Sequence, residues 1–177
     1  LEGNGKLGLF GVTYEEAEVI NLGIENANII GTGCTGILVA CNKGHVSTCS
    51  SAGHMQGGDS SGGLVGRNAG TISNSFNLAD VNGLGIIGGL VGSNEGTIDK
   101  CYSTGRVYRE SYTLSGLVGQ YDNGVIQDSF WDIDTSGQMW DDSVVDANVG
   151  QGLTTSDMQK KDTFLAAGWD FVGESDN

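Results

Sequence analysis

Apolar residues recur along the chain with a period of about 26 residues. One column of equivalent positions holds Leu9, Leu38, Leu64, Leu90 and Leu117, with spacings of 29, 26, 26 and 27 residues. A second column holds Val19, Val46, Ile72, Ile98 and Ile126, and a third holds Leu22, Cys49, Ser75, Cys101 and Ser129. Three columns in register over five units predict a repeat protein in which each unit packs against the next.

The residues between these columns favour short strands. Each unit is rich in Gly, Ser, Thr, Asn and β-branched residues and poor in strong helix formers, which disfavours a helical repeat. Stacked strands would place equivalent residues about 4.8 Å apart, so five coils would extend roughly 24 Å. Parallel crossover connections are right-handed. The sequence therefore predicts an all-β fold, a right-handed parallel β-helix solenoid of about five coils with a small C-terminal helical cap.

Asn-x-Gly triplets at 42–44, 68–70 and 94–96 mark the expected corners. Asparagine tolerates left-handed backbone angles and glycine adopts positive φ freely. Stacked asparagine amides can also hydrogen-bond along the axis. The side chains that we expect in structural ladders are Asn42, Asn68, Asn94, Leu64, Leu90, Leu117, Ile72, Ile98, Ile126, Cys49 and Cys101.

A Gly-Leu-Val-Gly element occurs at 63–66, 89–92 and 116–119, with Asn-x-Gly-Thr-Ile after the first two and Cys-Tyr-Ser-Thr-Gly at 101–105. These elements resemble the GLUG-motif repeats of bacterial and archaeal cell-surface proteins, including adhesins. The resemblance covers about residues 8–135 and implies a β-helical surface module without catalytic residues. The N-terminal end departs from it, since Ile37-Leu38-Val39-Ala40 replaces both motif glycines.

The repeat pattern ends after Phe130. We divide the chain into GLUG-type β-helix repeats at 1–135 and an irregular acidic segment with a short capping helix at 136–177. Ser156 to Gln159 has the spacing of a helix-capping box. A helix there would place Met158, Phe164, Leu165 and Trp169 over the open end of the last coil. Because the chain begins with Leu1, we expect a piece of a longer protein.

Composition narrows the possible partners. Glycine makes up 31 of 177 residues and proline is absent, which excludes a collagen-like chain. The formal net charge of −14 disfavours nucleic acid and anionic membrane surfaces as partners. No apolar run approaches the ~20 residues of a spanning helix, so we expect no membrane insertion.

The four cysteines are expected to be free thiols. Cys49 and Cys101 share a column two coils apart, about 9.6 Å, which exceeds the ~7 Å limit between the Cα atoms of a disulfide. We expect both to be buried. Cys34 and Cys41 flank a Leu-Val segment that we expect to be extended and to hold them apart. The spacings of Cys and His do not match those of a zinc site.

An acidic turn follows the last coil. Asp132, Asp134 and Gly137 resemble the first half of an EF-hand loop, and Asp141 lies nearby, but Ser143 occupies the position of the last ligand. A solvated acidic turn and a calcium site of other geometry are both open interpretations. No cofactor other than calcium is expected.

Phe76, Tyr102 and Phe130 each follow the third column by one residue and form an aromatic file. An outward file would offer a flat stacking surface for sugar rings. An inward or self-stacked file would be packing alone, and this is the interpretation that we favour.

We expect no enzyme activity, since acidic and basic residues do not cluster as general acid-base chemistry requires. The leading hypothesis is a non-catalytic structural or adhesion module at the cell surface that extends or presents binding elements of the same surface protein. The alternatives are a filament subunit that associates head to tail through open strand edges, and a carbohydrate-binding module.

Overall fold

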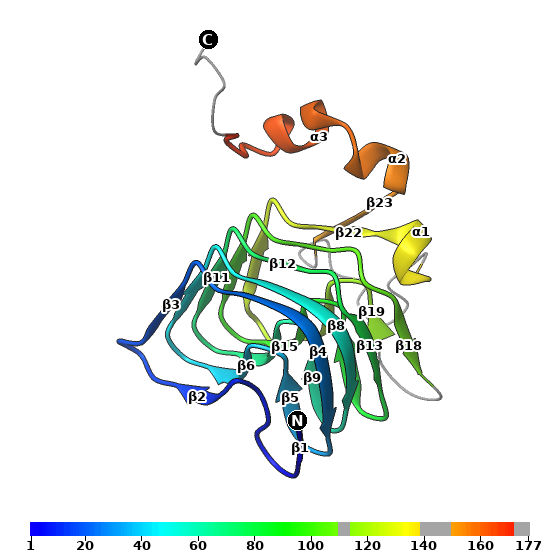
Figure 1. The fold of residues 1–177 in the computed structure, drawn as a ribbon. Helices are drawn as coiled ribbons and strands as arrows, with labels where there is room; N and C mark the ends of the chain where they lie inside the picture. Colours follow the sequence, from blue (N-terminus) through cyan, green and yellow to red (C-terminus); the bar gives the residue numbers. More distant parts are fainter. Residues whose placement is uncertain (110–113, 139–149, 172–177) are drawn as a thin grey trace.

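The computed structural model describes residues 1–109, 114–138 and 150–171 of the 177-residue chain. Within these residues the chain winds through about five coils of short parallel strands, and equivalent strands of successive coils pair side by side (Figure 1). The strands form four sheets, which we call A to D, that run along the solenoid. The prediction of an all-β parallel solenoid is confirmed.

Sheet A has nine strands: β1 (Glu2–Gly3), β4 (Gly23–Gly31), β8 (Ser50–Gly57), β12 (Phe76–Asn77), β13 (Asp80–Gly83), β17 (Tyr102–Ser103), β18 (Val107–Arg109), β22 (Phe130–Asp132) and β23 (Gln151–Leu153). Sheet B has β5 (Cys34–Gly36), β9 (Ser60–Gly62), β14 (Ile86–Gly88) and β19 (Leu114–Ser115). Sheet C has β2 (Phe10–Thr13), β6 (Val39–Asn42), β10 (Val65–Asn68), β15 (Val91–Asn94) and β20 (Val118–Tyr121). Sheet D has β3 (Glu18–Ile20), β7 (His45–Ser47), β11 (Thr71–Ser73), β16 (Thr97–Asp99) and β21 (Val125–Gln127).

The core is a set of stacked apolar columns inside the coils. Leu64, Leu90 and Leu117 are fully buried, and the Leu64 N–H donates to the Leu90 carbonyl at 3.0 Å. In sheet D, Ile72 pairs with Val46 on one side and with Ile98 on the other. Each residue therefore packs against its own equivalents, so the period of the sequence is also the register of the sheets.

A corner between sheets D and A repeats in every coil with a left-handed backbone. The residues there are Asn21, Thr48, Asn74, Lys100 and Asp128, with φ between 45° and 56°. This corner was not predicted, because Thr, Lys and Asp give no common signal for it.

The Asn-x-Gly corners lie between sheets C and D. The prediction that they need a glycine with positive φ is wrong, since Gly70 and Gly96 do not adopt it. A side chain on Gly70 would instead meet the Gly44 carbonyl of the preceding coil, so close stacking of the coils requires glycine there.

An asparagine ladder runs along the inside of the corner between sheets C and D. Asn42 Nδ2 donates to Asn68 Oδ1 at 2.8 Å, and Asn68 Nδ2 donates to Asn94 Oδ1 at the same distance. Thr13 Oγ1 donates to Asn42 Oδ1 at 2.6 Å and extends the ladder into the first coil. All four side chains are buried. Buried amides satisfied by one another join four successive coils.

Three short helices follow the coils: α1 (Ile133–Ser136), α2 (Thr155–Met158) and α3 (Lys161–Ala166). Thr154 caps α2 by accepting a bond from the Asp157 N–H at 3.1 Å. The expected cap at Ser156 is therefore wrong by two residues, because the neighbouring Thr154 provides the same chemistry earlier. α2 and α3 lie above the outer face of sheet A (Figure 1).

Candidate functional site

The outer face of sheet A carries the aromatic file. Phe76, Tyr102 and Phe130 are register partners on β12, β17 and β22. Their chain neighbours Asn77, Ser103 and Trp131 are buried in the coil, because successive side chains of a strand point to opposite faces. The file therefore points outward. Phe76 and Tyr102 stack with their ring centroids 4.9 Å apart and their planes at 3°.

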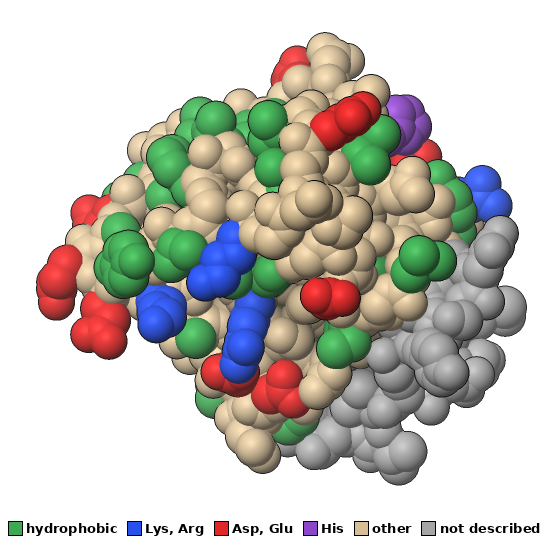
Figure 2. Space-filling model, turned by 90° about the horizontal axis from the view of Figure 1, so that it is seen from below, with side chains coloured by type: hydrophobic (Ala, Val, Ile, Leu, Met, Phe, Trp, Pro, Cys, Tyr) green, Lys and Arg blue, Asp and Glu red, His purple; other side chains and the backbone are tan. Residues whose placement is uncertain are grey.

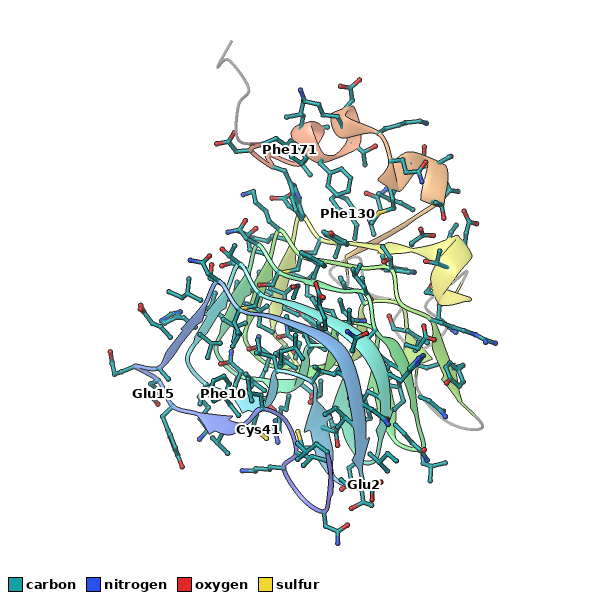
Figure 3. The ribbon with its side chains drawn as sticks, in the orientation of Figure 1. Glu2, Phe10, Glu15, Cys41, Phe130 and Phe171 are labelled. Carbon is teal, nitrogen blue, oxygen red and sulfur yellow. The ribbon has the colours of Figure 1, made fainter. Side chains whose placement is uncertain are left out.

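The C-terminal helices cover much of this file. Phe164 of α3 contacts Phe130 edge-on, with centroids 5.5 Å apart, and Trp169 lies 6.1 Å from the Tyr102 ring. Trp169 Nε1 also donates to the Asp128 carbonyl at 2.9 Å. Figure 3 shows Phe171, which contacts Phe164, beyond Phe130 on this side. Phe130 is only 4% exposed. The helix pair thus covers a sheet face rather than the open end of the coil that we predicted, because the outward file gives it an apolar surface to pack on.

A groove of about 410 Å³ remains between the file and the helices. Tyr102, Phe164, Trp169 and Met158 form much of its apolar lining, and Thr104 and Asp132 add polar groups. Burial raises the pKa of Tyr102 above its ordinary value, so its hydroxyl keeps its proton, and can donate a hydrogen bond, into the alkaline range as well as at neutral pH. Glycan binding at Phe76, Tyr102 and Phe130 stays a prediction. In this arrangement a sugar would meet the groove rather than an open three-ring platform.

The acidic turn serves as a hydrogen-bonded joint. Asp132 is 2% exposed, and its Oδ1 accepts bonds from the Asp134 and Thr135 N–H groups at 2.9 and 3.2 Å. The Thr155 hydroxyl lies 2.7 Å from Asp132 Oδ2, and the Thr155 N–H donates to Asp134 Oδ2 at 2.8 Å. The two carboxylates therefore fasten α2 to α1. Asp141, the third calcium candidate, lies outside the described residues, and calcium binding stays a prediction.

No group of three or more His, Cys, Asp or Glu side chains that could hold a metal ion occurs in residues 1–109, 114–138 and 150–171. In the same ranges, no helix has the length and apolar character needed to cross a membrane.

Comparison with known proteins finds one short motif that matches part of this chain. The model of the GLUG motif matches residues 83–108. These residues are similar to that motif. They begin at the end of β13 and run through β14, β15, β16 and β17 into β18, which is one complete turn of the solenoid. The segment that matches the GLUG motif is therefore a single coil, and its stacking partners supply the equivalent turns on either side.

A relative from Evansella cellulosilytica, whose name describes a Gly-rich membrane protein, is 33% identical over 75 residues. The match covers 40% of this chain and 8% of the relative. The chain therefore spans a small part of the length of that relative. No solved structure matches the chain.

Cys49 and Cys101 belong to the column that runs through the GLUG coil. Both are free and buried, with Ser75 between them in the column. The Cys49 N–H donates to Ser75 Oγ, and the Cys101 N–H donates to Ser129 Oγ, each at 3.0 Å. Burial raises the pKa of Cys101 to about 12. These thiols are inert packing groups.

Cys34 and Cys41 lie two coils before the GLUG motif, and here the prediction of separated thiols is wrong. Their Sγ atoms are 3.4 Å apart. The segment between them is not extended, because Cys34 lies on β5 of sheet B and Cys41 on β6 of sheet C. The chain turns between these sheets at Gly36, where a side chain would meet the Val39 carbonyl. The corner brings the two side chains together.

Among the strands that the structure describes, those of the first coil form the N-terminal edge of the solenoid. β2 and β3 are the outermost strands of sheets C and D, and β20 and β21 are outermost at the other end of these sheets. A hollow of about 440 Å³ at the N-terminal edge is lined by residues that include Phe10, Val12 and Leu22. Tyr14 is 70% exposed there and Ile20 is 49% exposed.

Proposed function

We propose that this chain is a rigid, non-catalytic structural module of a surface protein, displayed outside the cell, which extends or presents other parts of that protein. The observation that carries the proposal is the continuous strand pairing of sheet C along the solenoid. Sheet C pairs five strands in sequence, and the asparagine ladder joins Thr13 to Asn94 inside it. Backbone and side-chain bonds along one axis resist bending, as a spacer must.

Two further features support surface display. One coil matches the GLUG motif, whose repeats resemble those of cell-surface proteins. The relative that matches part of the chain is described by its name as a membrane protein. The net charge of −14 keeps the module soluble and repels nucleic acid. In this proposal its partners are the other domains of the same surface protein.

Labelling of cells that produce the full-length protein tests the location. An antibody raised against residues 1–138 is applied to intact cells and to permeabilised cells. We expect equal labelling of the two samples, with loss of the signal when intact cells are treated with protease. Labelling only after permeabilisation would contradict surface display.

Rigidity is tested separately from location. Spin labels are placed at Glu15 in the first coil and at Asp128 in the last, and the distance distribution is measured by double electron–electron resonance. We expect one narrow distribution that urea below the unfolding transition leaves unchanged. A broad distribution in native buffer would argue against a spacer.

A second candidate function is a filament subunit, and the open N-terminal edge favours it. A second copy could place its β20 and β21 against β2 and β3, which would continue sheets C and D from one molecule into the next. Such head-to-tail contacts do not close and so generate fibres. Sedimentation at rising concentration and electron microscopy test this. Ile20→Lys, at the edge, should abolish assembly, whereas Leu84→Lys, at an exposed site away from it, should not.

A further inference from the structure

The thiols of Cys34 and Cys41 lie next to each other at the corner between sheets B and C. The Cys41 thiol is directed at Cys34 Sγ at 3.4 Å, and the Cys34 thiol donates to the Ala40 carbonyl at 3.0 Å. A disulfide needs an S–S distance of about 2.05 Å, so the sulfur atoms have little distance to close. Cys41 lies on β6, and Figure 3 shows it near the lower end of the solenoid.

The pair faces away from the apolar core. In sheet C, Cys41 is the register partner of Arg67, whose side chain is exposed, and in sheet B Cys34 is the partner of Ser60. Cys34 is half-buried, whereas Cys41 is 9% exposed beside Val12 of the first coil. Figure 2 shows this side of the molecule from below, where Lys and Arg side chains gather among acidic and hydrophobic ones. A small reagent can therefore approach Cys34 without unfolding the coil.

We propose that Cys34 and Cys41 are the site of an intrachain disulfide, formed by exchange with a small-molecule disulfide outside the cell, which staples sheet B to sheet C in the second coil. The thiolate of Cys34 attacks the reagent RSSR, which forms a mixed disulfide and releases one RS⁻. The Cys41 thiolate then attacks the Cys34 sulfur and releases the second RS⁻. The two cysteine protons pass to the two leaving thiolates, so two thiols are oxidised and one disulfide is reduced.

Burial of the Cys34 thiol, more than the local charges, sets the rate of this exchange. Burial raises the pKa of the Cys34 thiol to about 12, while the positive charges of Lys6 and Arg67 act in the opposite direction. Only the thiolate reacts, so the rate should rise about tenfold per pH unit between pH 7 and 9. Because the pair is already assembled by the fold, ring closure should follow the first attack rapidly.

The chain supplies its own matched variants for the test. Ser60, the partner of Cys34, donates to the carbonyl six residues ahead at 3.0 Å, as Cys34 does. Ser93 is the buried equivalent of Cys41 two coils further on. Cys34→Ser and Cys41→Ser therefore place a side chain that the same position already accommodates. For the other two thiols, Ser75 and Ser129 show that Cys49→Ser and Cys101→Ser are tolerated in their column.

The experiment treats the reduced, folded chain with oxidised glutathione at pH 8.5 and follows intact mass and free thiols until both are constant. We expect the loss of two hydrogens, two remaining thiols, a peptide that links Cys34 to Cys41, and an unfolding temperature raised by roughly 5 °C. The double variant C49S/C101S should behave identically. Cys41→Ser should instead retain one glutathione on Cys34, because the resolving thiol is gone.

Three results would each overturn the proposal: four free thiols at the end point, a lasting glutathione adduct on the chain with all four cysteines, or a link that includes Cys49 or Cys101. A mass loss in Cys41→Ser equal to that of the unaltered chain would also contradict it.

Discussion

The corner between sheets C and D and the outer face of sheet A both stack equivalent side chains, but they are built from different chemistry. At the corner, each asparagine bonds to the next coil through the same two atoms, and all the amides are buried. On the outer face, the stacked pair Phe76 and Tyr102 is followed by Phe130, which contacts Phe164 from a distant part of the chain. In the first stack, the hydrogen bonds of each amide are satisfied by the asparagine of the next coil. In the second stack, the outward rings are covered by the C-terminal helix pair, which occurs once in the molecule.

This contrast predicts which regions of the molecule resist unfolding and which open locally. Breaking the ladder should weaken every coil, because each amide supports its neighbours on both sides. Removing the cover should loosen the C-terminal helices alone, because they are short and have few other contacts.

The largest effect is expected at the centre of the ladder. Asn68→Ala removes the acceptor of Asn42, the donor to Asn94 and the amide that binds Gly70. Buried groups left without partners should lower the free energy of unfolding by about 3 kcal/mol, measured by urea denaturation. Thr13→Ala, at the end of the ladder, should cost about 1 kcal/mol. Equal losses would show that the ladder does not act as a connected unit.

A smaller and local effect is expected from Trp169→Ala. This change removes ring contacts to Tyr102 and Phe130 and the bond to the Asp128 carbonyl. We expect the cover to lose roughly 2 kcal/mol of local stability. Proteolysis between 150 and 171 should become faster while the urea midpoint of the coils stays the same. Leu165→Ala, on α3 four residues before Trp169 and 39% exposed, is the control and should change neither.

The left-handed corner should respond to single substitutions by about 1 kcal/mol. Thr48 is β-branched and adopts φ 54°, whereas Asn74 occupies the equivalent place with φ 48°. Thr48→Asn should therefore raise the thermal midpoint, and Asn74→Thr should lower it. Calorimetry on both variants decides the matter, since shifts of the same sign would disprove the explanation.

The smallest effect concerns pH. Bonds from Lys160 and Thr154 lower the pKa of Asp157 in α2. A carboxylate with a lowered pKa stabilises the folded form above its ordinary pKa and stops doing so as the pH falls through the lowered value. In NMR spectra recorded as the pH is lowered, the amide chemical shifts of α2 should therefore move toward random-coil values between about pH 4 and 2, at a higher pH than those of β10. The variant Asp157→Asn should lose this dependence.

The periodic parts of this molecule could be predicted from the sequence, and the unique parts could not. Leu64, Leu90 and Leu117 repeat at the spacing of one coil, so their stacking could be predicted from the number of residues between them. The contact of Phe164 with Phe130 follows no period. The sequence indicates an apolar helix but not the surface on which it lies.

Three other features show the same limit. Cys34 and Cys41 meet because the chain turns at Gly36, and the absence of a glycine motif at 37–40 hid that corner. The bond between the Thr155 hydroxyl and Asp132 could not be predicted, because the two residues are 23 positions apart and follow no repeat. The left-handed corner is occupied by Asn, Thr, Asn, Lys and Asp in the five coils, so its backbone conformation repeats whereas its side chain does not.

Native-state amide hydrogen exchange is the measurement that tests the central claim most directly, namely that axial ladders make the coils one rigid unit. We predict that amides of β6, β10 and β15 exchange only through global unfolding, with the same free energy in all three strands, and that amides of α2 and α3 exchange through local opening at least a hundredfold faster. If each coil instead exchanged with its own free energy, or if the helices were protected as strongly as β10, the ladder would not be what unites the solenoid.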